Sequence, residues 1–212
     1  MKRIAVVEDH GILRTSFVNL INDEDNFTVI VEAENGQQLL TRINPLALPD
    51  VVLVDVEMPI MDGPETVLEL RKRYGNKMKI LALSIHKEVR LINEMLQNGA
   101  NGYVSKAASA NELFTGIKKV ISVGYYLSKD ISIIMKDSGL VILQNPKLSE
   151  KEEAILKLIY EEKGNPEIAE ILGIPRSTVN TYRTRMIEKV GATNTVGLVL
   201  YALREGICKL EE

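Results

Sequence analysis

The chain has 212 residues, of which 45% are hydrophobic and 26% charged, a composition typical of a globular protein with a hydrophobic core. Its formal net charge of -3 gives no general attraction for nucleic acid, so such a contact would need a local basic patch. Cys208 is the only cysteine, which excludes an intramolecular disulfide. The apolar run before Glu8 is too short for a signal peptide, and no run approaches the roughly 18 residues of a membrane span. We therefore expect a cytoplasmic protein.

Residues 1–123 alternate between short apolar runs and segments with a helical period. The expected strands are Arg3–Val7, Thr28–Ala33, Val51–Val54, Lys79–Leu83 and Gly102–Val104. The expected helices lie near Gly11–Asn22, Gly36–Ile43, Pro64–Tyr74, Lys87–Asn98 and Ser109–Val123. Continuously apolar strands that alternate with helices predict a doubly wound α/β domain, with a five-stranded parallel sheet covered on both faces.

Residues 124–146 break this alternation and are interpreted as a linker. Ser128 could cap a short helix that carries Ile131, Ile134 and Met135 on one side. The run Leu140–Leu143 is too apolar to be left exposed without cause, which makes a docked arrangement of the two domains plausible.

Residues 147–212 contain no convincing strand and predict a small all-α domain. Ser149 and Glu152 form a capping-box pattern at the start of its first helix, and Pro166 opens the second. Gly173–Pro175 is a tight break before a third helix that runs to about Val190, and a fourth follows at about residues 193–205. A short helix, a glycine-containing turn and a longer helix form the helix-turn-helix pattern.

Polar residues stand at the ends of several expected strands. Glu8 and Asp9 follow the first strand, and Asp55 ends the third. Ligands of open parallel sheets gather at the carboxyl ends of the strands, so these carboxylates should converge. Like charges held close together favour a cation between them, and Mg²⁺ prefers such oxygen ligands. Ser84 ends the fourth strand and Lys106 follows the fifth, where they could bind oxygens of a phosphoryl group on Asp55.

Each of these residues also has an ordinary structural explanation when it is taken alone. An acidic pair before a helix can serve only the helix terminus, Ser84 can be a helix cap, and Lys106 can be solvated. The combination is far more specific, because every residue stands at the appropriate strand end of one sheet.

The stretches VVEDH (Val6–His10), LVDVEMPIMDG (Leu53–Gly63), LALS (Leu81–Ser84) and GYVSKAAS (Gly102–Ser109) resemble the receiver domains of two-component response regulators. The resemblance implies a flavodoxin-like fold in which Asp55 takes phosphate from a histidine kinase. It implies that Mg²⁺ is held by Glu8, Asp9, Asp55 and the backbone carbonyl of Glu57. It further implies phosphoryl contacts from Ser84 and Lys106, and a side chain at Tyr103 whose rotamer reports phosphorylation.

This chain departs from many receivers at two of these positions. The acidic pair is Glu8-Asp9 where Asp-Asp is frequent, and Ser84 stands where Thr is frequent. Glu8 keeps a carboxylate and Ser84 keeps a hydroxyl, so we expect Mg²⁺ binding to survive. Glu57 and His86 occupy positions that tune dephosphorylation in receivers, with plain surface exposure as the alternative of equal weight. Kinase specificity is expected on the first helix, around Ile12, Leu13 and Thr15.

The C-terminal part resembles the DNA-binding domain of the NarL/FixJ/LuxR family. The resemblance rests on LSEKEEAILKLI (Leu148–Ile159), IAEILGIPRSTVNTYRTRMIEKVGA (Ile168–Ala192) and VLYALREGI (Val199–Ile207). It implies that the third helix enters the major groove and that the fourth mediates homodimerisation. The candidate dimer contacts are Val196, Val199, Leu200 and Leu203.

The third helix divides into a core side and a polar side. At about 100° per residue, its core side carries Val179, Tyr182, Met186 and Val190. The candidate DNA contacts are Arg176, Ser177, Asn180, Thr181, Arg183, Thr184 and Arg185. Arginines can hold phosphates while Asn and Thr read adenine and thymine, so we expect some preference for A·T pairs. Positions 180 and 184 are often basic in the family, so weaker binding with less salt dependence is expected here.

The leading hypothesis is a transcription regulator of a two-component system whose phosphorylation controls DNA binding, and not an enzyme with external substrates. Phosphorylation would bias a surface near the fourth helix and fifth strand, and output would follow from dimerisation, from release of an inhibitory domain contact, or from both. One alternative is a receiver whose output domain acts through protein partners or sequesters phosphate. The other is a small Mg²⁺-dependent phosphatase, for which Glu57 would be the second catalytic carboxylate.

Overall fold

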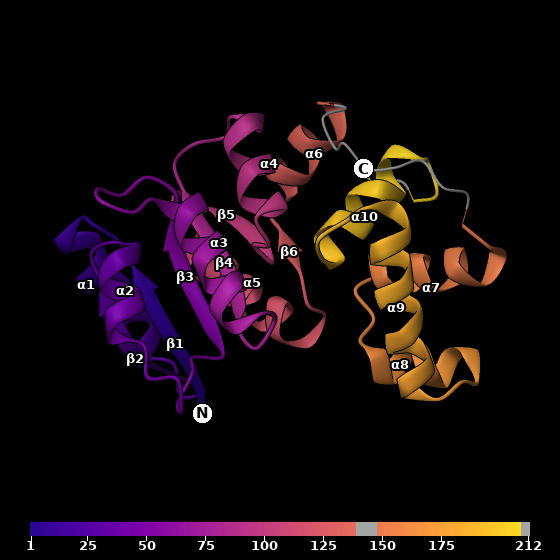
Figure 1. Ribbon diagram of the computed structural model, residues 1–212, viewed down its shortest axis with the longest axis horizontal. Helices are drawn as coiled ribbons and strands as arrows, with labels where there is room; N and C mark the ends of the chain where they lie inside the picture. The colour runs from indigo at the N-terminus through magenta and orange to yellow at the C-terminus, as the bar shows by residue number, and fades with distance from the viewer. Residues whose placement is uncertain (139–147, 209–212) are drawn as a thin grey trace.

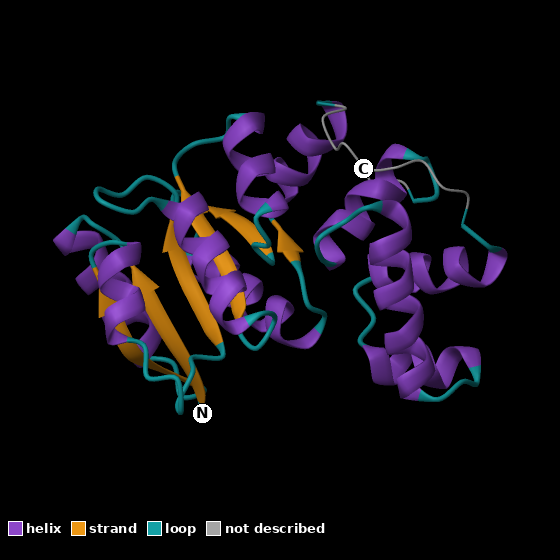
Figure 2. Cartoon of the chain, viewed as in Figure 1, coloured by secondary structure: helices purple, strands orange, loops and turns teal. Residues whose placement is uncertain are grey.

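A computed structural model describes residues 1–138 and 148–208 of the chain (Figure 1). The N-terminal part, from β1 (Lys2–Val7) to β6 (Tyr126–Leu127), is a sheet with helices on both of its faces, and the C-terminal part, from α7 (Glu150–Tyr160) to α10 (Thr195–Arg204), is helical (Figure 2). Among the described residues, no helix is long and apolar enough to cross a membrane.

The secondary structure follows the sequence pattern closely. The strands are β1 (Lys2–Val7), β2 (Phe27–Ala33), β3 (Val51–Asp55), β4 (Lys79–Ser84), β5 (Gly102–Ser105) and β6 (Tyr126–Leu127). The helices of the N-terminal part are α1 (Gly11–Asn22), α2 (Gly36–Arg42), α3 (Gly63–Tyr74), α4 (Val89–Gln97) and α5 (Ala110–Ser122). They are followed by α6 (Lys129–Asp137), α7 (Glu150–Tyr160), α8 (Asn165–Leu172), α9 (Arg176–Val190) and α10 (Thr195–Arg204).

The sheet is parallel with the strand order β2-β1-β3-β4-β5-β6, so the expected doubly wound α/β class is confirmed. The expected number of five strands is wrong, because β6 adds a sixth beside β5. Gly102 pairs with Tyr126, and the Tyr126 amide donates to the Asn101 carbonyl at 3.0 Å. A strand of two residues is too short to show the alternation of apolar and polar residues that predicts a strand, so the sequence pattern places this segment in a linker.

Strand residues alternate between two apolar layers, as the pleat of a sheet requires. Ile4 and Val6 of β1 belong to one buried cluster, together with residues of α1 and α5. Ala5 and Val7 belong to the other cluster, together with residues of α2, α3 and α4. The second cluster continues through α6 into the C-terminal part, so the two parts share one hydrophobic core.

The C-terminal part has the four helices expected from the sequence. Ser149 and Glu152 form the predicted capping box, with the Ser149 amide donating to Glu152 Oε2 at 2.8 Å. Gly173 ends α8 with a φ of 61°, in the left-handed region that favours glycine. In α6, Ile131 and Met135 are buried as expected, whereas the Ser128 hydroxyl donates to Asp130 instead of capping the helix. The apolar run 140–143 lies outside the described residues.

Helices α4 and α6 form the surface on which α10 docks (Figure 1). The Asn194 side-chain amide donates to the Ala100 carbonyl at 2.7 Å, and the Thr193 hydroxyl donates to the Leu96 carbonyl at 3.1 Å. On the other side of the contact, the Tyr125 hydroxyl donates to the Ile159 carbonyl at 3.1 Å. These polar bonds are directional, so they fix the orientation in which the shared apolar core brings the two parts together.

Gly63 allows α3 to begin directly against the end of β3. A Cβ atom at this position would lie 2.5 Å from the Asp55 carbonyl oxygen and 2.7 Å from Val56 Cα. The Gly63 amide donates to the Val56 carbonyl at 2.9 Å, which holds the loop closed. The position of Asp55 therefore depends on a residue without a side chain eight positions later.

We expect Gly63→Ala to lower the free energy of unfolding by about 1–3 kcal/mol, because backbone atoms must move to accept the methyl group. Urea unfolding followed by circular dichroism measures this effect. The control is Gly11→Ala, where an added Cβ meets only Arg14 Nη2 at 3.9 Å. Equal unfolding midpoints for the two variants would contradict this account of the loop.

Candidate functional site

Three carboxylates and an imidazole meet at the carboxyl edge of the central strands. β1 and β3 are neighbours in the sheet, so Glu8 and Asp9 after β1 come close to Asp55 at the end of β3. One ligand atom from each of Glu8, Asp9, His10 and Asp55 lies within 4.8 Å of every other. Glu8 and Asp55 are buried, with 1% and 4% of their surface exposed, so their charges are poorly screened by water.

Lys106 places a positive charge between two of these carboxylates. Its ammonium nitrogen lies 2.6 Å from Asp55 Oδ2 and 2.7 Å from Glu8 Oε2. Burial alone would lower the pKa of Lys106, but its hydrogen bonds and charge interactions with Asp55 and Glu8 outweigh burial and raise it. The Lys106 amide donates to the Ser84 carbonyl at 2.9 Å, so the backbone also ties this residue to the edge of β4.

Asp55 has the environment of a reactive carboxylate. Burial is the main cause that raises its pKa, and the charge of Glu8 adds to it, while Lys106 acts in the opposite direction. Its Oδ1 accepts a hydrogen bond from the Val56 amide at 2.7 Å, which fixes the carboxylate plane. The Lys106 ammonium contacts two of the three carboxylates, so the cluster retains excess negative charge.

Two buried oxygens in the cluster have charged groups as their nearest partners. Glu8 Oε2 lies 2.7 Å from the Lys106 ammonium, and Asp9 Oδ1 lies 2.9 Å from the His10 ring, in neither case with the alignment of a good hydrogen bond. Buried carboxylate charges that are incompletely balanced are costly, and a further cation relieves that cost. Hard oxygen donors are the ligands that Mg²⁺ prefers, so this donor set fits a divalent cation of that kind.

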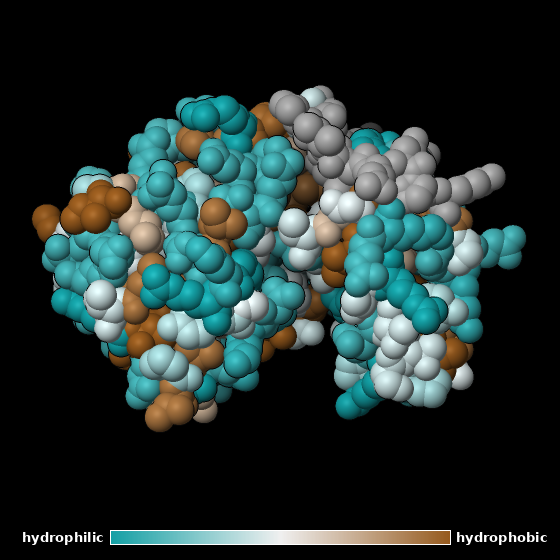
Figure 3. Space-filling model, viewed as in Figure 1, coloured by the Kyte–Doolittle hydropathy of each residue, from teal (hydrophilic) through white to brown (hydrophobic). Residues whose placement is uncertain are grey.

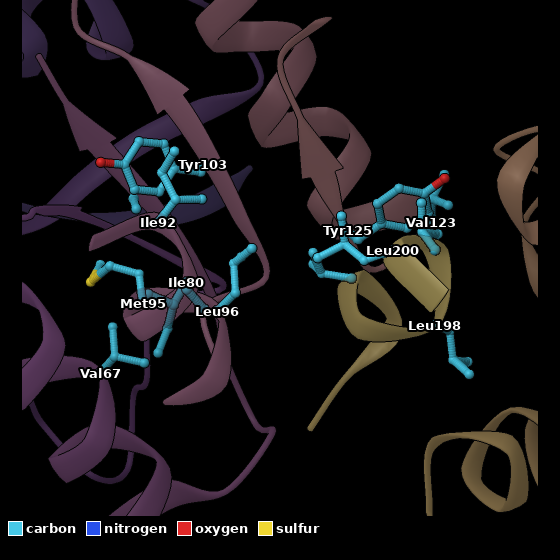
Figure 4. Close-up of a cluster of buried hydrophobic side chains, with 14 of the residues drawn as sticks. Val67, Ile80, Ile92, Met95, Leu96, Tyr103, Val123, Tyr125, Leu198 and Leu200 are labelled. Carbon is cyan, nitrogen blue, oxygen red and sulfur yellow. The ribbon is translucent and has the colours of Figure 1, made fainter. Parts of the chain in front are cut away.

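Ser84, His86 and Tyr103 form a chain of hydrogen bonds beside the carboxylates. The His86 amide donates to Ser84 Oγ at 3.0 Å, and the Tyr103 hydroxyl donates to the His86 carbonyl at 3.0 Å. Tyr103 is fully buried in an inward position against Ile92 of α4, as Figure 4 shows, and burial raises its pKa to about 12. The backbone of His86 therefore connects the hydroxyl of Ser84 to the ring of Tyr103.

The side chain of His86 lies between two carboxylates. Its Nε2 is 3.1 Å from Glu57 Oε2, and its Nδ1 is 3.3 Å from Glu88 Oε2. The Glu57 carboxylate thus points towards His86 and is not part of the acidic cluster, although the residue follows Asp55 closely. Sequence patterns do not predict the connecting role of His86, because its backbone amide and carbonyl make these bonds and every residue type except proline has both groups.

The candidate DNA contacts of α9 do not all share one exposed face. Six of the seven, Arg176, Ser177, Asn180, Thr181, Thr184 and Arg185, are exposed. Arg183 is buried, and its guanidinium donates to the Val123 carbonyl at 2.8 Å, to Thr195 Oγ1 at 3.1 Å and to Asn165 Oδ1 at 2.5 Å. In this docked arrangement Arg183 therefore contacts the N-terminal part and cannot hold a phosphate of DNA.

The candidate dimer contacts lie inside the shared core. Val196, Val199, Leu200 and Leu203 are all buried, in a helix that packs against α7 and α9 on one side and α4 and α6 on the other. Figure 4 shows Leu200 in the same group of buried side chains as Val123 and Tyr125 of the N-terminal part. These side chains are not available to a second copy while the two parts stay docked.

Comparison with known proteins agrees with both halves of this description. The chain matches the response regulator receiver domain over residues 4–118 and the luxR family of bacterial regulatory proteins over residues 146–202. It is 33% identical to the response regulator GacA of Pseudomonas viridiflava, over 98% of each chain. It is 32% identical to the response regulator UvrY of Escherichia coli strain K12, over 100% of this chain and 98% of that one.

Solved structures show the same fold. A LuxR-family two-component response regulator from Aurantimonas sp. SI85-9A1 is 28% identical and covers 64% of this chain and 96% of its own, with a TM-score of 0.59. RcsB from Salmonella enterica serovar Typhimurium is 20% identical and covers 96% of this chain and 98% of its own, with a TM-score of 0.58. The chain therefore belongs to the two-component response regulators, with an N-terminal receiver domain and a C-terminal DNA-binding domain of the LuxR type.

Proposed function

We propose that Asp55 accepts a phosphoryl group from a histidine kinase, and that this modification releases the LuxR-type domain to bind promoter DNA as a homodimer. The observation that carries the proposal is the position of the buried Asp55 carboxylate, 2.6 Å from the Lys106 ammonium and beside the carboxylates of Glu8 and Asp9. In the transfer, an Asp55 oxygen forms a bond to phosphorus as the bond from phosphorus to the kinase imidazole breaks.

The residues around Asp55 have separate roles in this proposal. Glu8, Asp9, Asp55 and the Glu57 carbonyl would hold Mg²⁺, which reduces repulsion between the carboxylates and the incoming phosphoryl oxygens. Lys106 neutralises charge that develops on the transferred group, and the Ser84 hydroxyl donates to one of its oxygens. The carboxylate of Glu57 faces His86, which favours a regulatory position over the catalytic role that a phosphatase would need.

The connection to the output domain runs through α4. When the Ser84 hydroxyl turns to the phosphoryl group, it no longer accepts the hydrogen bond from the His86 amide. The backbone of His86, just before α4, then moves, and the Tyr103 hydroxyl that is bonded to the His86 carbonyl moves with it. In the last turn of the same helix, Leu96 accepts the hydrogen bond from Thr193, and Ala100, three residues beyond the helix, accepts that from Asn194. A shift of α4 therefore weakens the docking of α10 directly.

Undocking would complete the DNA-binding surface. It frees Arg183 to join the six exposed candidates of α9, and it exposes the outer side of α10 for contact with a second copy. The Asn and Thr residues of α9 favour A·T pairs, as proposed from the sequence. The related RcsB has been solved bound to promoter P1flhDC in the presence of the phosphomimetic BeF3⁻, which supports DNA as the ligand.

We expect Asp55→Asn to abolish labelling by acetyl phosphate, because the amide lacks the nucleophilic oxygen of the carboxylate. Mass spectrometry of the intact protein, incubated with Mg²⁺, measures the phosphorylated fraction. Asp25→Asn changes an exposed aspartate in the same way and should leave labelling unchanged. Persistent Mg²⁺-dependent labelling of Asp55→Asn would show that the phosphoacceptor is another residue.

We expect Glu8→Gln to raise the Mg²⁺ concentration needed for half-maximal labelling by about tenfold or more, because it removes one charged ligand. The measurement is a Mg²⁺ titration of the labelling rate. Glu65→Gln, at an exposed position of α3, is the matched control. An unchanged Mg²⁺ requirement in Glu8→Gln would remove Glu8 from the metal site.

We expect Asn194→Asp to raise the DNA affinity of the unphosphorylated protein by about tenfold, since losing one buried hydrogen bond costs about 1–3 kcal/mol. Aspartate keeps the cap of α10, where Asn194 Oδ1 accepts from the Gly197 amide, but it cannot donate to Ala100. Asn35→Asp makes the same change at the cap of α2, away from the contact. A gel-shift titration that gave equal affinities for both variants would argue against docking as the inhibitory contact.

A further inference from the structure

A cavity of about 450 Å³ lies between the receiver and the LuxR-type domain. The receiver side is formed by Lys79 at the start of β4 and by residues 121–124, at the end of α5 and directly after it. The other side is formed by α9 and by the first residues of α8 and α10. This volume lies within the range of about 300–1,000 Å³ that is usual for small-molecule sites.

Arg183 is a buried cation that has no carboxylate partner among the described residues. It is 9% exposed, and the atoms that accept its hydrogen bonds are a backbone carbonyl, an amide oxygen and a hydroxyl. Buried charges are ordinarily paired with an opposite charge, because burial removes the solvation that stabilises them. The positive charge of Arg183 is therefore uncompensated within the cavity.

Lys79 adds a second uncompensated cation. Within residues 1–138 and 148–208, no hydrogen bond or ion pair of its ammonium is seen. Burial lowers the pKa of Lys79, and the positive charges of Arg71 and Arg183 lower it further. Arg71 does not line the cavity, but it donates to Oδ1 of Asn101, a lining residue, at 2.6 Å. Its other hydrogen bonds in the described part of the chain also go to neutral oxygens.

The donors on the two domains converge near Gly124. An added Cβ at Gly124 would lie 3.5 Å from Arg183 Nη2, 3.7 Å from Thr195 Oγ1 and 4.0 Å from Lys79 Nζ, so these three atoms lie close together beside Gly124. Thr195 is the first residue of α10 and lines the cavity, so the positive end of that helix also lies there. Donors from the receiver and from two elements of the LuxR-type domain thus gather on one side of the cavity.

Acidic groups near the cavity do not cancel this charge. Glu188 lines the wall but is exposed, and no ion pair joins it to Lys79 or Arg183 in the described part of the chain. Glu167, in the first turn of α8, accepts a hydrogen bond from the Gly164 amide at 2.8 Å and is engaged there. The lining residues leave a net positive charge where the two domains meet.

We propose that this cavity binds a small phosphate-bearing anion, held by Lys79 from the receiver and by Arg183 and the start of α10 from the LuxR-type domain. Arginine and helix N-termini are suited to phosphate oxygens, because several N–H groups point at the ligand together. The ligand contacts both domains, so it binds the docked arrangement better than the open one and stabilises it.

The consequence for output rests on the proposed function. Asn180 and Thr184 of α9 line the same cavity, and Arg183 is shared between the anion and the expected DNA surface. The anion and DNA therefore bind different arrangements of the two domains, and each lowers the affinity for the other by the same factor. A small metabolite would in this way act against phosphorylation.

The test uses the unphosphorylated full chain, without DNA or divalent cations, and inorganic pyrophosphate as the probe. Isothermal titration calorimetry at fixed ionic strength should show saturable binding that Lys79→Gln weakens by about tenfold or more. Lys77→Gln removes an exposed charge two residues away that does not line the cavity, and it should bind like the wild type. No saturable binding, or equal binding by the two variants, would overturn the proposal.

A second variant guards against an indirect effect of the first. Asn76 is exposed at the rim of the cavity, so Asn76→Asp adds a negative charge there without disturbing the core, and it should also weaken pyrophosphate binding. Lys79→Gln should unfold at the same temperature as the wild type or higher, because it removes a partly buried charge that forms no ion pair in the described part of the chain. Because neither DNA nor Asp55 takes part, failure here leaves the phosphoacceptor proposal intact. Pyrophosphate binding that Asn76→Asp leaves unchanged would place the anion elsewhere.

Discussion

The Lys106 ammonium, held 2.6 Å from Asp55 and 2.7 Å from Glu8, is the interaction around which the receiver site is organised. It keeps two buried carboxylates close together at the end of adjacent strands, where their repulsion would otherwise separate them. It does not balance the third carboxylate, and the remaining negative charge is what makes the site receptive to a divalent cation. The same ammonium then lies beside the oxygen that is proposed to receive the phosphoryl group.

The sequence was sufficient for the parts of the structure that local pattern determines. Asp55 and Ser84 stand at strand ends, and parallel order alone brings such residues to one edge. Arg183 shows the limit, because its helical position suggests an exposed DNA contact, whereas its partner Val123 lies 60 positions away in the chain, in the other domain. A docked arrangement is plausible from the apolar linker, but the part that α10 plays in it and the two-residue strand β6 are not predictable from local pattern. Both depend on contacts with segments distant in the sequence.

Helix α4 joins the two functions of the molecule. One end follows the segment in which His86 is bonded to Ser84 and Tyr103, and the other end and the loop directly after it carry the carbonyls that Thr193 and Asn194 bind. A short helix moves as a rigid element, so a change of a few hydrogen bonds at one end is transmitted to the other. In the described part of the chain, the cavity beside this contact holds cations without carboxylate partners, and on our proposals the docked state responds to anions as well as to phosphorylation.

The most direct test of this account is amide hydrogen exchange on the full chain before and after phosphorylation with acetyl phosphate and Mg²⁺. The account predicts faster exchange along the docking surface, at Gly99–Tyr103 and at the start of α10, once Asp55 is phosphorylated. The Asp55→Asn protein, treated in the same way, should show no change. Unaltered exchange at this surface in a fully phosphorylated sample would contradict the claim that phosphorylation releases the LuxR-type domain.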